Sequence, residues 1–94
     1  MIFLDCYDSD GLTGYGFSHE GFWSGGYELK RAYDAYECAD LCDKDNECIA
    51  FSYRYGDNKQ CIGYKSLGLV AELPGISRAY VKCVGMSKNI WLPC

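Results

Sequence analysis

The sequence predicts a small α+β domain that disulfide bonds hold together, and three observations support this fold class. Cys38 and Cys42 stand four residues apart, so on a helix they would lie one above the other on the same face. An alternating apolar pattern at residues 49–55 is followed by a turn and a second β pattern at 61–66, which is typical of a β-hairpin. The chain has 94 residues, 7 of them cysteines. A domain of this size buries little apolar surface, so covalent links would add stability that it needs.

The first third of the chain predicts short β segments. Residues 2–7 are mostly apolar and predict a first strand. Residues 8–26 interleave glycines with aromatic side chains, which favours tight turns and short strands over a helix. Residues 27–31 predict a further strand before the helix.

The aromatic side chains of this segment have two interpretations. They supply the core of a small domain, or they form a surface that stacks against sugar rings or a partner protein. We favour the core, with Trp23, beside Gly25 and Gly26, as the side chain that lies on the surface. The aromatic residues concerned are Tyr15, Phe17, Phe22, Trp23 and Tyr27.

The helix is predicted from about residue 33 to about residue 44. Asp34 and Glu37 stand three residues apart at its start, as in a capping box, in which a carboxylate accepts hydrogen bonds from unpaired backbone N–H groups. Their negative charge also lies at the positive end of the helix dipole. Cys38 and Cys42 would then point in one direction, towards the hairpin.

The rest of the folded chain predicts a hairpin and a last strand. Residues 49–55 alternate between apolar and small or polar side chains, so we expect a strand with one buried face, with Phe51, Tyr53 or both in the core. A turn, the second hairpin strand, a connecting loop and the last strand are expected at residues 56–59, 61–66, 67–75 and 77–84.

Three cysteine motifs follow one another in this region: Glu37-Cys38-Ala39-x-x-Cys42, Cys48-x-x-Phe51-Ser52-Tyr53 and Cys61-x-x-Tyr64-Lys65-Ser66. Together they resemble the central motif of the PAN/apple domain family, and the resemblance extends over roughly Cys6 to Cys83. It implies a curved antiparallel sheet that cradles one helix. It also implies an extracellular module that binds proteins or carbohydrates.

The resemblance also implies how the cysteines pair, which their spacing alone leaves open. The implied bonds are Cys6–Cys83, Cys38–Cys61 and Cys42–Cys48. Cys94 then has no intramolecular partner, and an odd cysteine in a secreted chain suggests an intermolecular bond or a free thiol. We therefore divide the chain into a PAN/apple-like domain at residues 1–84 and a tail at residues 85–94.

The composition indicates where the protein is located and which classes of ligand it is not expected to bind. The formal net charge of −4 speaks against nucleic acids and heparin-like polyanions as ligands. Residues 1–47 carry 11 acidic and 3 basic side chains, and residues 48–94 carry 2 acidic and 6 basic side chains, so the acidic side of one molecule could meet the basic side of another.

The cysteine density predicts an extracellular or cell-surface protein. No membrane span and no signal peptide are visible, since Asp5 interrupts the apolar start, so we expect a mature form or a fragment.

No pattern predicts a catalytic, metal or cofactor site. Cys38, Cys42 and Cys48 do not form paired zinc-ligand motifs with His19, and the expected setting favours disulfides. The run Asp8-Ser9-Asp10-Gly11 lacks the rest of a calcium loop and indicates an Asx turn. No nucleophile and base pattern accompanies His19, so we do not expect an enzyme.

The sequence therefore predicts a non-catalytic extracellular interaction module that acts through protein contacts, with other copies of itself as candidate partners in an oligomer or filament. Ile90, Trp91 and Leu92 form an apolar cluster in the tail, which we expect to pack on a neighbouring subunit with Cys94 close to a partner cysteine. The alternative is a carbohydrate-binding, lectin-like module that binds sugars through exposed aromatic side chains such as Trp23 and Tyr15.

Overall fold

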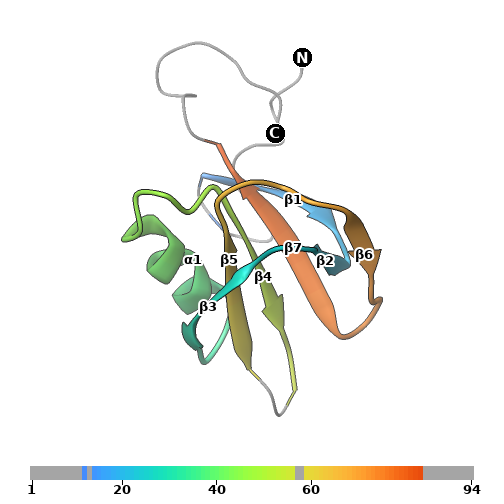
Figure 1. The fold of residues 1–94 in the computed structure, drawn as a ribbon. Coiled ribbons are helices and arrows are strands. Elements are labelled where there is room, and N and C mark those ends of the chain that lie inside the picture. Colours follow the sequence, from blue (N-terminus) through green and yellow to red (C-terminus); the bar gives the residue numbers. More distant parts are fainter. Residues whose placement is uncertain (1–11, 13, 57–58, 84–94) are drawn as a thin grey trace.

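A five-stranded antiparallel sheet forms the centre of the fold, with one helix and a two-stranded sheet packed against it (Figure 1). The computed structural model describes residues 12, 14–56 and 59–83. The large sheet has the strand order β1-β7-β4-β5-β3, and the small sheet pairs β2 with β6. The elements are β1 Tyr15–His19, β2 Gly21–Trp23, β3 Tyr27–Arg31, α1 Ala35–Asp43, β4 Ala50–Arg54, β5 Gln60–Tyr64, β6 Val70–Glu72 and β7 Ser77–Lys82. This arrangement confirms the predicted small α+β class.

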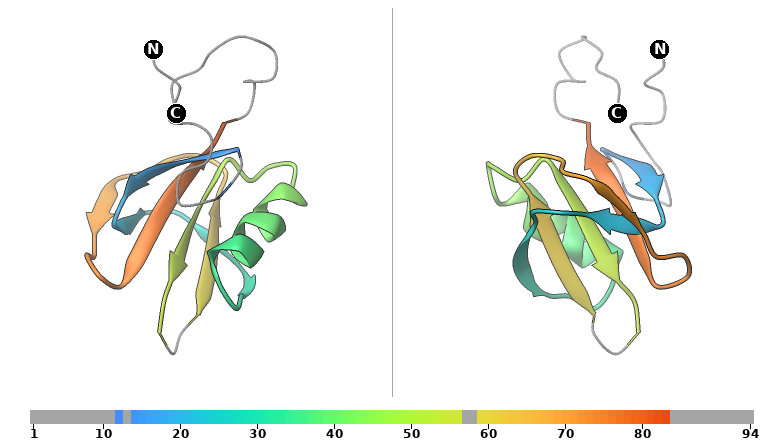
Figure 2. Two further views of the ribbon diagram at one scale, coloured as in Figure 1. Left: turned by 180° about the vertical axis from the view of Figure 1, so that it is seen from behind. Right: turned by 45° about the vertical axis from the view of Figure 1, so that its right-hand side comes forward.

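The layers lie on opposite faces of the large sheet. The helix α1 packs against β4, β3 and β5, whereas β2 packs against β7 and β4. When the molecule is turned by 180°, α1 comes to the front and β2 and β6 lie behind the large sheet (Figure 2). Each face of the sheet therefore has its own buried cluster, one around Phe51 and Cys38 and one around Trp23 and Tyr64.

The start of α1 is capped as the sequence predicts. Asp34 is the N-cap, and its Oδ1 accepts a hydrogen bond from the Glu37 N–H at 2.9 Å. The Glu37 Oε1 in turn accepts the Tyr33 N–H at 2.7 Å. The helix begins at Ala35 because the backbone of Asp34 is extended, which is the conformation of a cap residue.

Two disulfide bonds hold α1 on the sheet. Cys38 is bonded to Cys61 in β5, and Cys42 is bonded to Cys48 in the loop before β4. These are two of the three pairings that the family resemblance implies. All four cysteines are buried, so the bonds form part of the core between helix and sheet.

The central strand β4 is buried on both faces, which corrects the prediction of a single buried face. Phe51 and Tyr53 face the helix side and are 0% and 2% exposed, as predicted. Ala50 and Ser52 on the other face are 0% and 2% exposed as well. The reason is the small sheet, because β2 covers this second face of β4.

The prediction that residues 67–75 form only a connecting loop is wrong, because this segment contains β6. The strand has only three residues, and its pairing with β2 is a contact between distant parts of the chain. Gly21 permits the close approach of the two strands. Its φ is +150°, and a Cβ at this position would collide with the carbonyl oxygen of Ala71.

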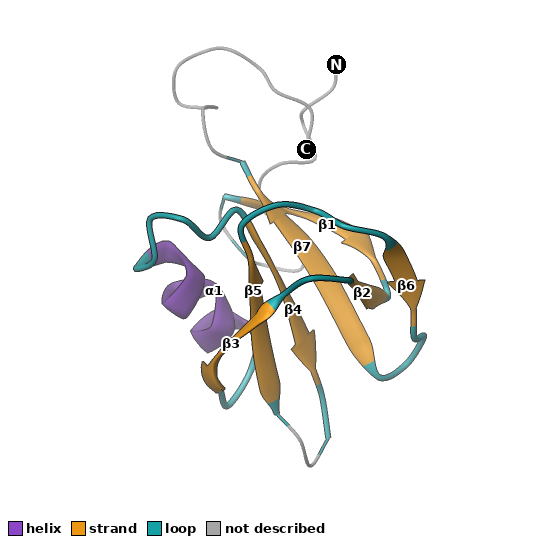
Figure 3. Ribbon diagram, in the orientation of Figure 1, coloured by secondary structure: helices purple, strands orange, loops and turns teal. Residues whose placement is uncertain are grey.

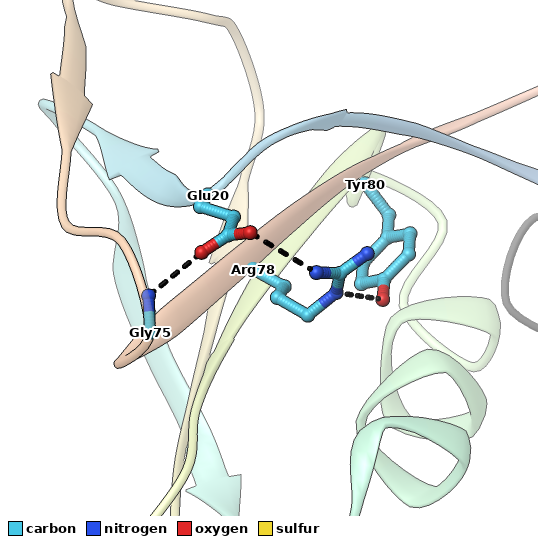
Figure 4. Close-up of polar contacts among 4 residues, drawn as sticks. All are labelled: Glu20, Gly75, Arg78 and Tyr80. Atoms are coloured by element: carbon cyan, nitrogen blue, oxygen red, sulfur yellow. Dashed lines mark hydrogen bonds and ion pairs between the residues drawn. The ribbon is translucent and has the colours of Figure 1, made fainter.

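A polar network fixes the small sheet to the large one (Figure 4). Glu20 lies between β1 and β2, and its Oε1 accepts the N–H of Gly75 at 2.7 Å. Its Oε2 lies 3.5 Å from Nη1 of Arg78 in β7. The Arg78 Nε donates to the hydroxyl of Tyr80 at 3.1 Å. The network joins the turn before β2, the loop after β6 and strand β7.

A second polar contact joins β3 to the loop after α1 and gives a pH-dependent prediction. The Tyr27 hydroxyl donates to Asp45 Oδ2 at 2.8 Å. Burial, followed by this hydrogen bond, raises the pKa of Tyr27 to about 12, and the same bond lowers the pKa of Asp45. Because the pKa of Asp45 is lower in the folded state, the interaction stabilises the fold at pH values above the unfolded-state pKa of Asp45. This contribution is lost as the pH falls through the folded-state pKa.

We expect the Tyr27→Phe substitution to raise the pKa of Asp45 towards its ordinary value, because the phenylalanine ring cannot donate the hydrogen bond. An NMR titration of the Asp45 carboxyl group measures this directly. Tyr33→Phe, at an exposed tyrosine elsewhere, is the control and should leave the Asp45 titration unchanged. An unchanged Asp45 pKa in Tyr27→Phe would show that the hydrogen bond does not cause the shift.

Candidate interaction surface

Exposed tyrosines gather where the start of α1 meets the turn between β4 and β5. Tyr33 is 78% exposed, Tyr36 is 57% exposed and Tyr55 is 38% exposed. Lys59 lies beside Tyr33, with its Nζ 5.7 Å from the centroid of the Tyr33 ring. We call Tyr33, Tyr55 and Lys59, which line one hollow together, the tyrosine surface.

Backbone contacts hold the tyrosine surface in place. The N–H of Ala32 donates to the carbonyl of Lys59 at 3.0 Å, and the carbonyl of Ala32 accepts the hydroxyl hydrogen of Tyr53 at 2.8 Å. The segment that carries Tyr33 is therefore bonded to both β4 and β5. Tyr55 continues β4 and packs edge-to-face on Tyr53, with 5.1 Å between the ring centroids.

Two shallow hollows flank the pair formed by Tyr33 and Lys59. One has a volume of about 330 Å³ and the other about 390 Å³, and both are lined by Tyr33 and Lys59. Glu37 lines the first hollow and Asp34 lines the second. The surface therefore combines aromatic rings with both signs of charge, which suits contacts with another protein better than chemistry on a substrate.

His19 is the one histidine of the sequence, and its ring is engaged in local contacts. Both ring nitrogens of His19 have partners, since Nδ1 lies 2.8 Å from the Ser18 hydroxyl and Nε2 lies 3.1 Å from the Phe22 carbonyl oxygen. Within residues 12, 14–56 and 59–83, no three His, Cys, Asp or Glu side chains gather as metal ligands would. In the same residues no helix is long and apolar enough to cross a membrane.

The prediction that Trp23 lies on the surface is wrong, and so is the use of Trp23 and Tyr15 as exposed binding residues. Trp23 is 4% exposed. It lies in β2 of the small sheet and packs against Tyr64 of the large sheet, with 5.1 Å between the ring centroids. Tyr15 is 1% exposed and its hydroxyl donates to Asp43 Oδ1 at 2.7 Å. Burial and this bond raise the pKa of Tyr15 above its ordinary value. Both aromatics belong to the core.

Several predicted site residues lie outside the described part of the chain. These are Cys6, Ile90, Trp91, Leu92 and Cys94. The Cys6–Cys83 bond, the contact made by the tail and the division at residue 84 therefore stay predictions.

No sequence pattern predicted a binding role for the tyrosine surface. The helix predicted from the sequence included Tyr33, and residues 56–59 predicted only a turn. One local signal was present: Tyr33 directly precedes the cap residue Asp34, so it lies outside the helix, where a side chain can stay exposed. The proximity of Lys59 to Tyr33 depends on the hydrogen bond between Ala32 and Lys59, which are far apart in the sequence, and could not be read locally.

Comparison with known proteins places this fold in a family. The family model described as the PAN domain matches residues 13–90, which include every strand and the helix described above. No curated protein and no solved structure matches the chain. PAN domains are generally non-catalytic modules that bind proteins or carbohydrates. They are typically extracellular, a setting that the two disulfide bonds fit. With the matched segment spanning well over half of its length, the chain belongs to the PAN domain family.

Proposed function

We propose that this PAN domain is a non-catalytic extracellular interaction module that binds protein through the tyrosine surface, with a second copy of the chain as its partner. The observation that carries the proposal is the 78% exposure of Tyr33 between two hollows. A tyrosine so placed offers a large ring and a hydroxyl at low cost in side-chain entropy. Tyrosine is enriched at protein interfaces and among the residues that contribute most to binding.

The charges around Tyr33 favour a second copy as the occupant. In a two-fold dimer the same patch meets itself, so a self-complementary patch must carry both signs of charge. Here Lys59 lines both hollows, with Glu37 in the lining of one and Asp34 in the lining of the other. A two-fold arrangement would place the Lys59 of one copy opposite the carboxylates of the other.

The carbohydrate-binding alternative loses its original support. It rested on Trp23 and Tyr15 as exposed stacking platforms, and both are buried. A glycan could still stack on Tyr33, so a glycan array is a useful second assay. Glycan binding without any self-association would favour that alternative over the proposed protein contact.

Sedimentation equilibrium over a range of concentrations tests the proposal. We expect the parent domain to associate weakly, and Tyr33→Ala to weaken association at least about tenfold, which corresponds to about 1.4 kcal/mol. Leu69→Ala is the matched control, because Leu69 is 79% exposed but lies outside the tyrosine surface. Association that is absent in the parent, or that survives unchanged in Tyr33→Ala, would contradict the proposal.

The tail at residues 85–94 supplies a competing contact that the same assay separates. The Trp91→Ala, Cys94→Ser double variant removes the predicted anchor and the thiol. If association depends on the tyrosine surface, this variant should associate as the parent does. If it becomes monomeric while Tyr33→Ala still associates, the tail is the interface and the proposed surface is wrong.

A further inference from the structure

A second concave site lies on the face of the large sheet opposite α1. It is a cleft of about 220 Å³, and its walls and floor include Phe22, Ser52, Arg54, Gln60, Ile62 and Tyr64. We call it the sheet cleft. Figure 3 shows β2 and β6 beside part of the large sheet, with the lower ends of β4 and β5 extending past them. Residues of β2 line the cleft together with residues of β4 and β5.

Strand register determines which groups meet in the sheet cleft. Arg54 in β4 pairs with Gln60 in β5 and with Ser77 in β7, so these three form one row across the sheet. In the next row on the same face, Ser52 is opposite Ile62. Long polar side chains therefore border the open end of the cleft, and smaller or apolar groups form its floor.

The floor holds one more hydroxyl hydrogen than it has acceptors for. Ser52 is 2% exposed and Tyr64 is 0% exposed, and their hydroxyl oxygens lie 2.9 Å apart. The Tyr64 oxygen also accepts the backbone N–H of Trp23 at 3.3 Å. Two hydroxyl groups carry two hydrogens, and only one can lie between them. The other hydrogen, on whichever oxygen it resides, has no acceptor among the described residues.

The charge in the cleft is also unbalanced. Arg54 is half-buried, and among the described residues no carboxylate lies within ion-pairing distance of its guanidinium. No Asp or Glu lines the cleft. A guanidinium donates in a fixed fork that matches the two oxygens of a carboxylate, and such paired, charge-assisted hydrogen bonds are among the strongest that proteins form. The described lining of the cleft thus contains a positive charge and no negative one.

We infer that the sheet cleft binds a compact carboxylate ligand. Arg54 binds the two carboxylate oxygens, and the spare hydroxyl hydrogen of the Ser52 and Tyr64 pair donates to a further oxygen of the ligand. The body of the ligand packs between Phe22 and Ile62. The volume is that of roughly seven water molecules, at about 30 Å³ each, which suits one six-membered ring with its carboxylate. This site is separate from the tyrosine surface and does not depend on its proposed function.

Three small molecules serve as probes in NMR titrations of the whole domain. Glucuronate is a sugar ring with a carboxylate, cyclohexanecarboxylate is a ring with a carboxylate and no hydroxyls, and glucose is the sugar without the charge. We expect glucuronate to shift the amide signals of Ser52, Arg54 and Gln60, and glucose to leave them in place. A response to both carboxylates assigns the site to carboxylates in general. A response to glucuronate alone assigns it to sugar acids.

Variants at Arg54 test the predicted contact. Arg54→Met should weaken carboxylate binding at least about tenfold, and Arg54→Lys should restore only part of it, since lysine keeps the charge but loses the fork. Lys44→Met removes an exposed charge at the end of α1, outside the sheet cleft and outside the tyrosine surface, and is the control, which should bind as the parent does. Unfolding midpoints close to that of the parent would show that each variant is folded.

Equal binding of glucose and glucuronate would overturn the inference. So would no response to either carboxylate at roughly 10 mM, which corresponds to affinity weaker than about −3 kcal/mol.

Discussion

Replacing Phe51 with alanine is expected to lower the free energy of unfolding by about 3–5 kcal/mol, the range found when large buried aromatics are truncated. Phe51 is 0% exposed in the central strand β4. It stacks on Tyr80 with 5.2 Å between the ring centroids and meets the edge of Tyr15 at 5.0 Å. Its removal would leave a cavity between sheet and helix, where two disulfide bonds limit how far α1 can move to fill it.

Urea unfolding with the disulfides intact, analysed by linear extrapolation, measures this loss. Leu69→Ala is the control, because a side chain that is 79% exposed should cost no more than about 0.5 kcal/mol when truncated. A loss below about 1 kcal/mol for Phe51→Ala would mean that the cluster around Phe51 does not form a tightly packed core.

The second large expected loss in the free energy of unfolding follows removal of either of the two disulfide bonds. Cys38 and Cys61 are 23 residues apart, whereas Cys42 and Cys48 are 6 apart. In the chain-entropy description a bond stabilises by restricting the unfolded chain, and the restriction grows with the length of the closed loop. Replacing both Cys38 and Cys61 with alanine should therefore cost about 3.5 kcal/mol. Replacing both Cys42 and Cys48 should cost about 2.4 kcal/mol.

Paired substitutions avoid leaving a single reactive thiol, and peptide mapping of each variant would first verify that the remaining bonds have not exchanged. The free energies of unfolding of the two double variants are then compared with that of the parent. An equal or larger loss for the Cys42 and Cys48 variant would show that native-state packing around the shorter bond, and not loop length, determines the effect.

The parts of the fold that local patterns specify were predictable from the sequence. The capping pair Asp34 and Glu37 and the cysteines at Cys38 and Cys42 mark the helix within a short stretch of chain, so its position was found to within two residues at each end. The segment with Phe51 and Tyr53 likewise forms a strand with these side chains in the core. Each of these features depends on residues close together in the sequence.

The small sheet was not predictable in the same way, and the error at Trp23 followed from it. Strand β6 has three residues without a clear alternation, and it becomes a strand only by pairing with β2. Without β6, Trp23 beside two glycines appeared to lie on a surface. With β6 in place, Trp23 is enclosed, and the second face of β4 is buried.

The two candidate sites depend on pairing across the sheet for the same reason. Lys59 lies next to Tyr33 because the chain before α1 is bonded to the start of β5. Arg54 and Gln60 border one cleft because β4 and β5 pair in that register. The cysteine motifs pointed to the family and the fold, but they carry no information about which exposed side chains meet.

An NMR dilution series of the parent domain tests the central claim, that the tyrosine surface is a protein contact, most directly. If two copies meet there, the amide signals of Tyr33 and Lys59 should move progressively as the protein is concentrated, while that of Leu69 stays in place. Added salt should reduce the movement, because exposed ion pairs between the copies are screened. Signals that do not depend on concentration, or movement confined to residues outside the tyrosine surface, would contradict the account.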